Sequence, residues 1–119
     1  ILDLGEANFD PEILKSEIPA LVLFWAPWSR PCVLLKRVVE EVAADCAGKV
    51  KVARVNADDN PDLGLLYAIQ SIPTLLFFAE GNVRARIVGT ASKEAILAKM
   101  KAFRVAAMAS ALPDNVPAW

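Results

Sequence analysis

The sequence contains no histidine and only two cysteines, Cys32 and Cys46. Without histidine, the chain cannot build a Ser/His or Cys/His catalytic pair or a histidine-containing metal site. If both cysteines lie on one helix, they stand about 21 Å apart, whereas a disulfide needs Cα atoms within about 7 Å. We therefore expect no metal site and no cofactor. Two thiols that cannot pair fit a reducing compartment such as the cytoplasm, or two buried small hydrophobic residues.

The sequence also lacks long hydrophobic runs and an excess of basic charge. The 119 residues are 55% hydrophobic, yet no apolar run approaches the roughly 18 residues of a membrane-spanning helix. The net charge is −1 and no basic patch is present, so we expect neither nucleic acid nor a membrane as a partner. The length suits one domain with one core.

Apolar spacing and turn residues predict alternating strands and helices. The run Ala20–Trp25 is apolar throughout, as in a central strand buried on both faces. Further strands are predicted at 1–4, 49–57, 74–79 and 83–89, and helices at 10–16, 61–67 and from 92 onward. A longer helix, about 30–47, is predicted by five apolar residues at helical spacing: Leu34, Leu35, Val38, Val39 and Val42.

The predicted element order is β-α-β-α-β-α-β-β-α. Alternating strands and helices imply a parallel core sheet, to which a hairpin at residues 80–82 adds an antiparallel edge. We therefore expect an α/β fold with a central mixed sheet flanked by helices on both faces.

The C-terminal segment differs from the rest of the chain. Residues 103–119 carry only two charges, Arg104 and Asp114. We assign residues 1–102 to one domain and residues 103–119 to a helix extension and tail. Either the last helix simply continues and packs on the sheet, or the segment docks on a partner or a fused domain.

Three stretches carry a family resemblance: FWAPWSRPC at 24–32, VARVNADDNPDLGLLYAIQSIPTLLFF at 52–78, and EGNVRARIVG at 80–89. Together they resemble the thioredoxin family over roughly residues 9–102. The stretch at 24–32 looks like the family signature Trp-Ala-x-Trp-Cys-x-Pro-Cys. The stretch at 52–78 resembles the third strand, third helix and cis-proline loop, and that at 80–89 the hairpin with its closing glycine. The resemblance implies the thioredoxin fold and an ancestry among protein-disulfide oxidoreductases.

The resemblance also implies where the chemistry lies. It maps the attacking cysteine onto Ser29 and the resolving cysteine onto Cys32. In the family, a helix N-terminus stabilises the attacking thiolate, and the second thiol, one turn on, resolves the mixed disulfide. Ile72 and Pro73 map onto the cis-proline position, whose backbone can pair with an extended substrate segment.

A contact surface for protein or peptide segments is implied around this motif. Trp28, Ile72, Val88 and Gly89 match the apolar rim of the family. Arg30 and Pro31 lie inside the motif, and we expect them beside the same groove, although Arg30 also fits a plain solvated surface charge.

Three positions depart from the family pattern. Ser29 cannot form a disulfide, so dithiol exchange should be abolished, but serine is a favourable N-cap for the following helix. Leu23 replaces a buried aspartate that accepts a proton, and Arg37 replaces a proline that kinks the helix. Cys32 is either an inert thiol beneath the loop or a single thiol open to oxidation or glutathione.

These observations leave three hypotheses. The first, which we favour, is a redox-silent thioredoxin-like module that binds extended or unfolded segments in a chaperone-like or scaffold role. The second is a conventional disulfide reductase carrying an engineered Cys-to-Ser substitution at Ser29, which predicts that Ser29→Cys restores full activity. The third is an assembly domain with an empty groove and a tail that mediates oligomerisation.

Overall fold

A computed structural model of the chain describes the backbone of residues 1–111 and the side chains of residues 1–102. Its strands form one sheet in the order β1-β3-β2-β4-β5. The strands are β1 (Leu2–Leu4), β2 (Ala20–Trp25), β3 (Lys51–Asn56), β4 (Thr74–Ala79) and β5 (Asn82–Val88). The helical elements are a turn η1 (Asp10–Leu14), α1 (Arg30–Asp45), α2 (Pro61–Leu66) and α3 (Lys93–Ala111).

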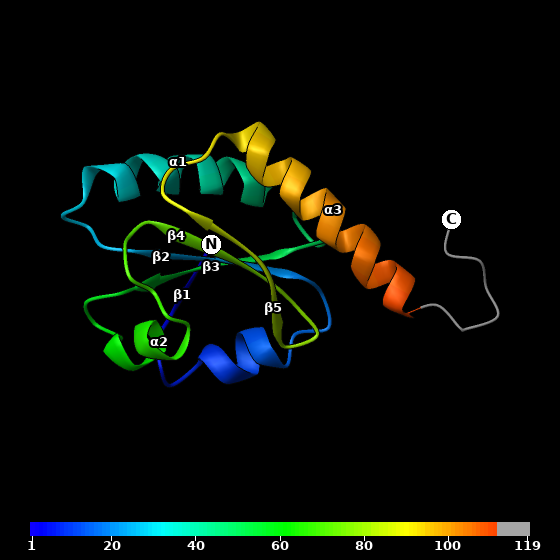
Figure 1. Cartoon of the computed structure of the whole chain (residues 1–119), viewed down its shortest axis with the longest axis horizontal. Helices are drawn as coiled ribbons and strands as arrows, with labels where there is room; N and C mark the ends of the chain where they lie inside the picture. The colour runs from blue at the N-terminus through cyan, green and yellow to red at the C-terminus, as the bar shows by residue number, and fades with distance from the viewer. Residues whose placement is uncertain (112–119) are drawn as a thin grey trace.

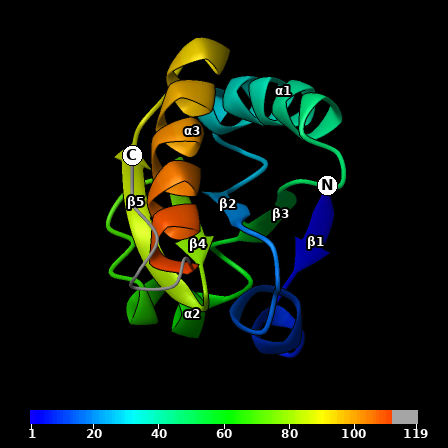
Figure 2. The same ribbon diagram turned by 90° about the vertical axis from the view of Figure 1, so that its right-hand side faces the viewer.

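Helices cover both faces of the sheet, which confirms the predicted α/β fold. Figure 1 shows α1 and α3 on one face, and α2 with the η1 turn on the other. Figure 2 shows the same layers from the side. β2 lies in the centre and is buried on both faces, as its continuous apolar run predicts.

The direction of β4 differs from the expectation. β1, β3 and β2 are parallel, but β4 runs antiparallel to β2, so the antiparallel part of the sheet is not confined to the closing hairpin. The physical reason is the length of α2. Its six residues span only about 9 Å, less than the roughly 20 Å of a six-residue strand. The chain therefore does not cross the sheet face before β4 begins.

This arrangement brings two loops together. β4 begins at Thr74, which pairs with Phe24 near the end of β2. The loop before β4 and the loop after β2 consequently meet at one edge of the sheet, at the N-terminus of α1. This is the edge at which the sequence places the candidate site.

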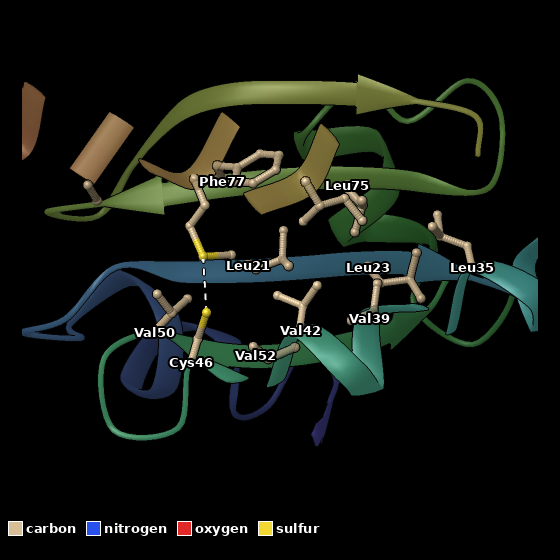
Figure 3. Packing of buried hydrophobic residues seen from close by; sticks show 13 residues of the cluster. Leu21, Leu23, Leu35, Val39, Val42, Cys46, Val50, Val52, Leu75 and Phe77 are labelled. Carbon is tan, nitrogen blue, oxygen red and sulfur yellow. Dashed lines mark hydrogen bonds between the residues drawn. The ribbon is translucent and has the colours of Figure 1, made fainter. Parts of the chain in front are cut away.

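Apolar side chains fill the space between the sheet and the pair α1 and α3. Figure 3 shows Leu21 and Leu23 of β2 in one cluster with Leu35 and Val39 of α1. Full burial of such a side chain contributes about 1.5–3 kcal/mol to the free energy of unfolding. Leu34 departs from the predicted pattern, because it is 48% exposed. It lies one residue before Leu35 and therefore about 100° around the helix, away from the core.

The opposite face of the sheet is packed with aromatic rings. Phe9, Phe78 and Tyr67 contact one another with ring centroids 5.4 to 5.7 Å apart. The hairpin between β4 and β5 turns through Glu80 and Gly81, both with positive φ. An added Cβ at Gly81 would lie 2.9 Å from the Leu14 carbonyl oxygen, so glycine is required there.

α3 continues without a break across residue 102, the boundary drawn from the sequence. Ile96 and Met100 bury this helix against the core cluster. The proposed docking of the segment 103–119 depends on side chains that lie outside the described residues.

Candidate functional site

Ser29 forms the N-cap of α1, as the sequence predicts. Its backbone is extended, with φ −92° and ψ 116°. Its Oγ accepts a hydrogen bond from the Cys32 N–H at 3.4 Å. Pro31 occupies the first turn, where its missing N–H leaves no unsatisfied donor. The Ser29 oxygen is thus engaged in stabilising the helix start.

Cys32 lies in the first turn of α1 and is 0% exposed. Its thiol is free, as is that of Cys46 at the far end of the helix. Reaction with a substrate disulfide requires that the attacking sulfur be accessible. In this conformation Cys32 cannot meet a substrate.

Leu23 occupies the position that the family resemblance assigns to a proton-accepting carboxylate. Its side chain is fully buried and lies in the apolar cluster with Leu35 and Val39 (Figure 3). Neighbouring β3 carries Arg54 in register with Leu23. β2 therefore supplies no carboxylate at this position that could accept a proton from a thiol.

Arg54 instead forms an ion pair at the edge of the sheet. Its guanidinium donates hydrogen bonds to the Asp3 carboxylate of β1, and this lowers the pKa of Asp3 below its ordinary value. The guanidinium also lies 4.8 Å from the centroid of the Trp25 ring. Arg54 therefore links β3 to β1 through its ion pair and packs against the Trp25 ring.

Trp28 presents a fixed aromatic surface beside the motif. It is 72% exposed, and its Nε1–H donates to Asp58 Oδ2 at 2.6 Å. The loop holding Asp58 is itself fixed, because the Asp58 N–H donates to Asn56 Oδ1 at 2.9 Å. Polar contacts from the loop after β3 thus set the orientation of the indole.

The loop before β4 is held by two side chains. Thr74 Oγ1 donates to the Ser71 carbonyl at 2.7 Å, and the Arg86 guanidinium donates to the Tyr67 carbonyl at 2.6 Å. The Ile72–Pro73 peptide bond is cis. Neither the N–H nor the C=O of Ile72 has a hydrogen-bond partner among the residues that the structure describes.

A hollow of about 410 Å³ connects this loop with Trp28. We call it the α2-side hollow. Its lining comprises Trp28, Ala57, Asp58, Pro61, Gly64, Leu65, Ile69, Gln70, Ser71 and Ile72. Two predicted rim residues, Trp28 and Ile72, thus share one concave surface. An apolar hollow beside unpaired backbone groups suits an extended peptide.

The other predicted site residues lie around this hollow without lining it. Val88 is 60% exposed at the end of β5, and the Gly89 N–H donates to the Pro73 carbonyl at 2.8 Å. Pro73 itself is buried, so it shapes the loop. Arg30 lines a second hollow on the other side of Trp28, and Pro31 is exposed on the first turn of α1.

Sequence reasoning missed Leu65 and Asp58. Leu65 is 82% exposed and lines the α2-side hollow. The sequence offered one signal, the adjacent apolar pair Leu65-Leu66. In the structure neither side chain packs into the core, and both are exposed. No sequence pattern indicates the contact between Asp58 and Trp28, since these residues are 30 positions apart.

The described residues offer neither a metal centre nor a membrane-spanning helix. Within them, no three Asp, Glu, Cys or His side chains gather closely enough to hold a metal ion. None of the described helices has the length and apolar character needed to cross a membrane.

Comparison with known proteins decides the family. The family model named Thioredoxin matches residues 1–102. The chain belongs to the thioredoxin family. This thioredoxin-family chain is 41% identical to a thioredoxin of Pseudomonas aeruginosa, over 86% of the chain and 94% of the relative.

Other similar proteins come from bacteria and from chloroplasts. Identity is 44% to thioredoxin 1 of Nostoc sp., over 74% of this chain and 82% of the relative. It is 38% to the chloroplastic M-type thioredoxin of Spinacia oleracea, over 81% of this chain and 53% of the relative. The chain is therefore a thioredoxin-like protein of a redox family.

Proposed function

We propose that this thioredoxin-family protein binds extended or unfolded protein segments in the Trp28/Ile72 groove without exchanging disulfides. Its role is then chaperone-like or that of a scaffold. The observation that carries the proposal is the burial of Cys32, the only thiol of the motif, beneath a serine whose oxygen caps the helix. Two free thiols support placing it in a reducing compartment such as the cytoplasm.

The chemistry of the motif supports the absence of exchange. Exchange begins when a thiolate attacks a disulfide sulfur, and a second thiol then resolves the mixed disulfide. Ser29 supplies an oxygen that neither ionises readily near neutral pH nor forms a disulfide. Leu23 supplies no carboxylate to accept the proton of Cys32. Both halves of the dithiol cycle therefore lack a participant.

The groove supports the binding role. Trp28 offers a large aromatic face held by Asp58, and the Ile72 backbone offers a donor and an acceptor that no described residue pairs with. An extended segment can pair with such backbone groups as an added strand while its side chains enter the hollow. Leu65 adds exposed apolar surface on the α2 side.

Insulin reduction by dithiothreitol tests the redox part. We expect the unmodified protein to give no rate above the dithiothreitol background, whereas Ser29→Cys recreates a dithiol and gives a measurable rate. Cys46→Ser serves as the matched control, because it removes the other thiol and leaves the motif intact. A clear rate from the unmodified protein that Cys32→Ser abolishes would show that Cys32 attacks alone and contradict the proposal.

Binding of an unfolded protein tests the proposed binding role of the groove. Reduced, carboxymethylated α-lactalbumin offers extended segments and no free thiol. We expect Trp28→Ala to weaken its binding about tenfold, a size typical of an aromatic anchor. Leu66→Ala is the control, because Leu66 is exposed nearby but does not line the hollow. Equal affinities for all three proteins would favour the assembly hypothesis instead.

The conventional reductase stays a second candidate. One observation favours it: the Ser29 side chain lies at the helix N-terminus, one turn from Cys32. Replacing this one side chain by cysteine would give the motif two thiols. This candidate predicts full reductase activity for Ser29→Cys. Our proposal predicts a slow enzyme, because Leu23 still supplies no proton acceptor.

A further inference from the structure

A second hollow of about 420 Å³ lies on the other side of Trp28, over the first two turns of α1. We call it the α1-side hollow. Its lining comprises Pro27, Trp28, Arg30, Val33, Leu34 and Arg37. Trp28 lines both hollows, so the two hollows adjoin at this residue. A segment that crosses Trp28 therefore reaches both hollows.

The α1-side hollow carries two cations that have no partner among the described residues. The side chains of Arg30 and Arg37 form no ion pair or hydrogen bond with any residue that the structure describes. Both are exposed, and no carboxylate lines the hollow. The two arginines stand seven residues apart, which places them on one face of the helix, about 10 Å apart along its axis.

An exposed apolar side chain stands between these cations. Leu34 lies four residues after Arg30 and three before Arg37, so it shares their helix face. It is 48% exposed because this face of α1 points away from the core. Leu34 and Trp28 thus give the hollow an apolar floor and wall, with a positive charge at each end.

The two hollows differ in charge. Asp58 lines the α2-side hollow, and exposed Asp59 and Asp62 follow it in the same loop and helix. A carboxylate of a bound segment is repelled on that side and attracted on the α1 side. Charge complementarity therefore selects which part of a segment lies over α1.

We propose that the α1-side hollow is a specificity subsite for acidic stretches of the bound segment, with carboxylates at Arg30 and Arg37 and an apolar side chain over Leu34. This inference rests on the proposed binding function and names the class of segment that the groove selects. The partner is an extended protein stretch in which an acidic, an aliphatic and a second acidic residue occupy every second position, because alternate residues of an extended chain share one face. The arginines act in selection and take no part in chemistry.

Two matched peptides test the inference. One carries Glu, Leu and Glu at every second position with Ser between them, and its twin carries Gln in place of every Glu; both bear the same fluorescent label. We expect the unmodified protein to bind the Glu peptide about three- to tenfold tighter, as two solvent-exposed ion pairs allow. The preference should shrink in high salt, because screening weakens exposed ion pairs.

The double variant Arg30→Gln, Arg37→Gln should lose this preference and bind the Glu and Gln peptides equally. The control is Lys49→Gln, Arg84→Gln, which removes the same charge from exposed positions outside both hollows. A preference that persists in the arginine variant, or falls equally in the control, overturns the inference. So does equal binding of the two peptides by the unmodified protein.

The failure of the underlying function gives a different result. If neither peptide binds, or if Trp28→Ala binds both as tightly as the unmodified protein, the groove is not a binding site and both proposals fail. If both peptides bind, depend on Trp28 and show no preference, the groove function stands and the subsite alone is rejected.

Discussion

The two ends of α1 each hold a buried cysteine in very different surroundings. At the N-terminal end, Cys32 lies beneath the Ser29 cap, next to exposed Trp28. At the C-terminal end, Cys46 Sγ lies 3.8 Å from Met100 Sδ, in the contact between α1 and α3 (Figure 3). Burial alone therefore does not distinguish a site position from a packing position.

The neighbours make the distinction. Around Cys32 the chain leaves apolar side chains exposed and the backbone groups of Ile72 without described partners. The backbone of Cys46 is paired on both sides: its N–H donates to the Val42 carbonyl at 2.9 Å, and its carbonyl accepts from the N–H groups of Lys49 and Val50, at 2.9 and 3.1 Å. The unused groups at the N-terminal end of α1 support the proposed binding surface, whereas the paired backbone of Cys46 and its contact with Met100 indicate a packing role.

Met100→Ala disrupts the contact between α1 and α3 at Cys46 and should have the largest effect on stability. Met100, a residue of α3, is almost fully buried against Cys46. Truncating such a side chain leaves a cavity and lowers the free energy of unfolding by about 2–5 kcal/mol. Urea denaturation followed by circular dichroism measures the loss. Met100→Leu, which conserves volume, should lose less than about 1.5 kcal/mol; equal losses would show that shape, not volume, matters at this contact.

Ser29→Ala tests the cap at the site end. The variant leaves the buried Cys32 N–H without its acceptor, so we expect a loss of about 1–2 kcal/mol in the same assay. Ser92→Ala is the matched control. Ser92 caps α3 through the Ala95 N–H at 3.1 Å, but it is exposed, so water replaces its oxygen and the loss should be smaller. A larger loss for Ser92→Ala would contradict the capping role assigned to Ser29.

Gly48→Ala tests how α1 ends and should have the smallest effect. Gly48 has φ +81°, but nothing lies within 4 Å of an added Cβ. Only backbone strain opposes alanine, so we expect a loss of about 1 kcal/mol. Gly48→Asn should lose less, because asparagine tolerates this conformation. Equal losses for both variants would mean that a side chain at this position is unfavourable for another reason.

Several features followed from the sequence because they depend on neighbouring residues. The continuous apolar run predicts β2, and the polar turn at residues 80–82 between two strand-like stretches predicts the hairpin. Ser29 before Pro31 predicts the N-cap, because the hydrogen bond spans one turn of helix. The resemblance of the motif stretches also placed the chain in the thioredoxin family, which the family comparison confirms.

Other features depend on contacts between distant segments, which no local pattern encodes. The antiparallel direction of β4 follows from the short span of α2, and the exposure of Leu34 and Leu65 follows from which helix faces meet the sheet. The orientation of Trp28 depends on Asp58, and the partner of Arg54 is Asp3 on another strand. The sequence by itself determined the fold class and the identity of the motif, because both rest on residues close together in the chain. Only the tertiary structure decided which side chains surround Trp28, because packing brings them together from separate elements.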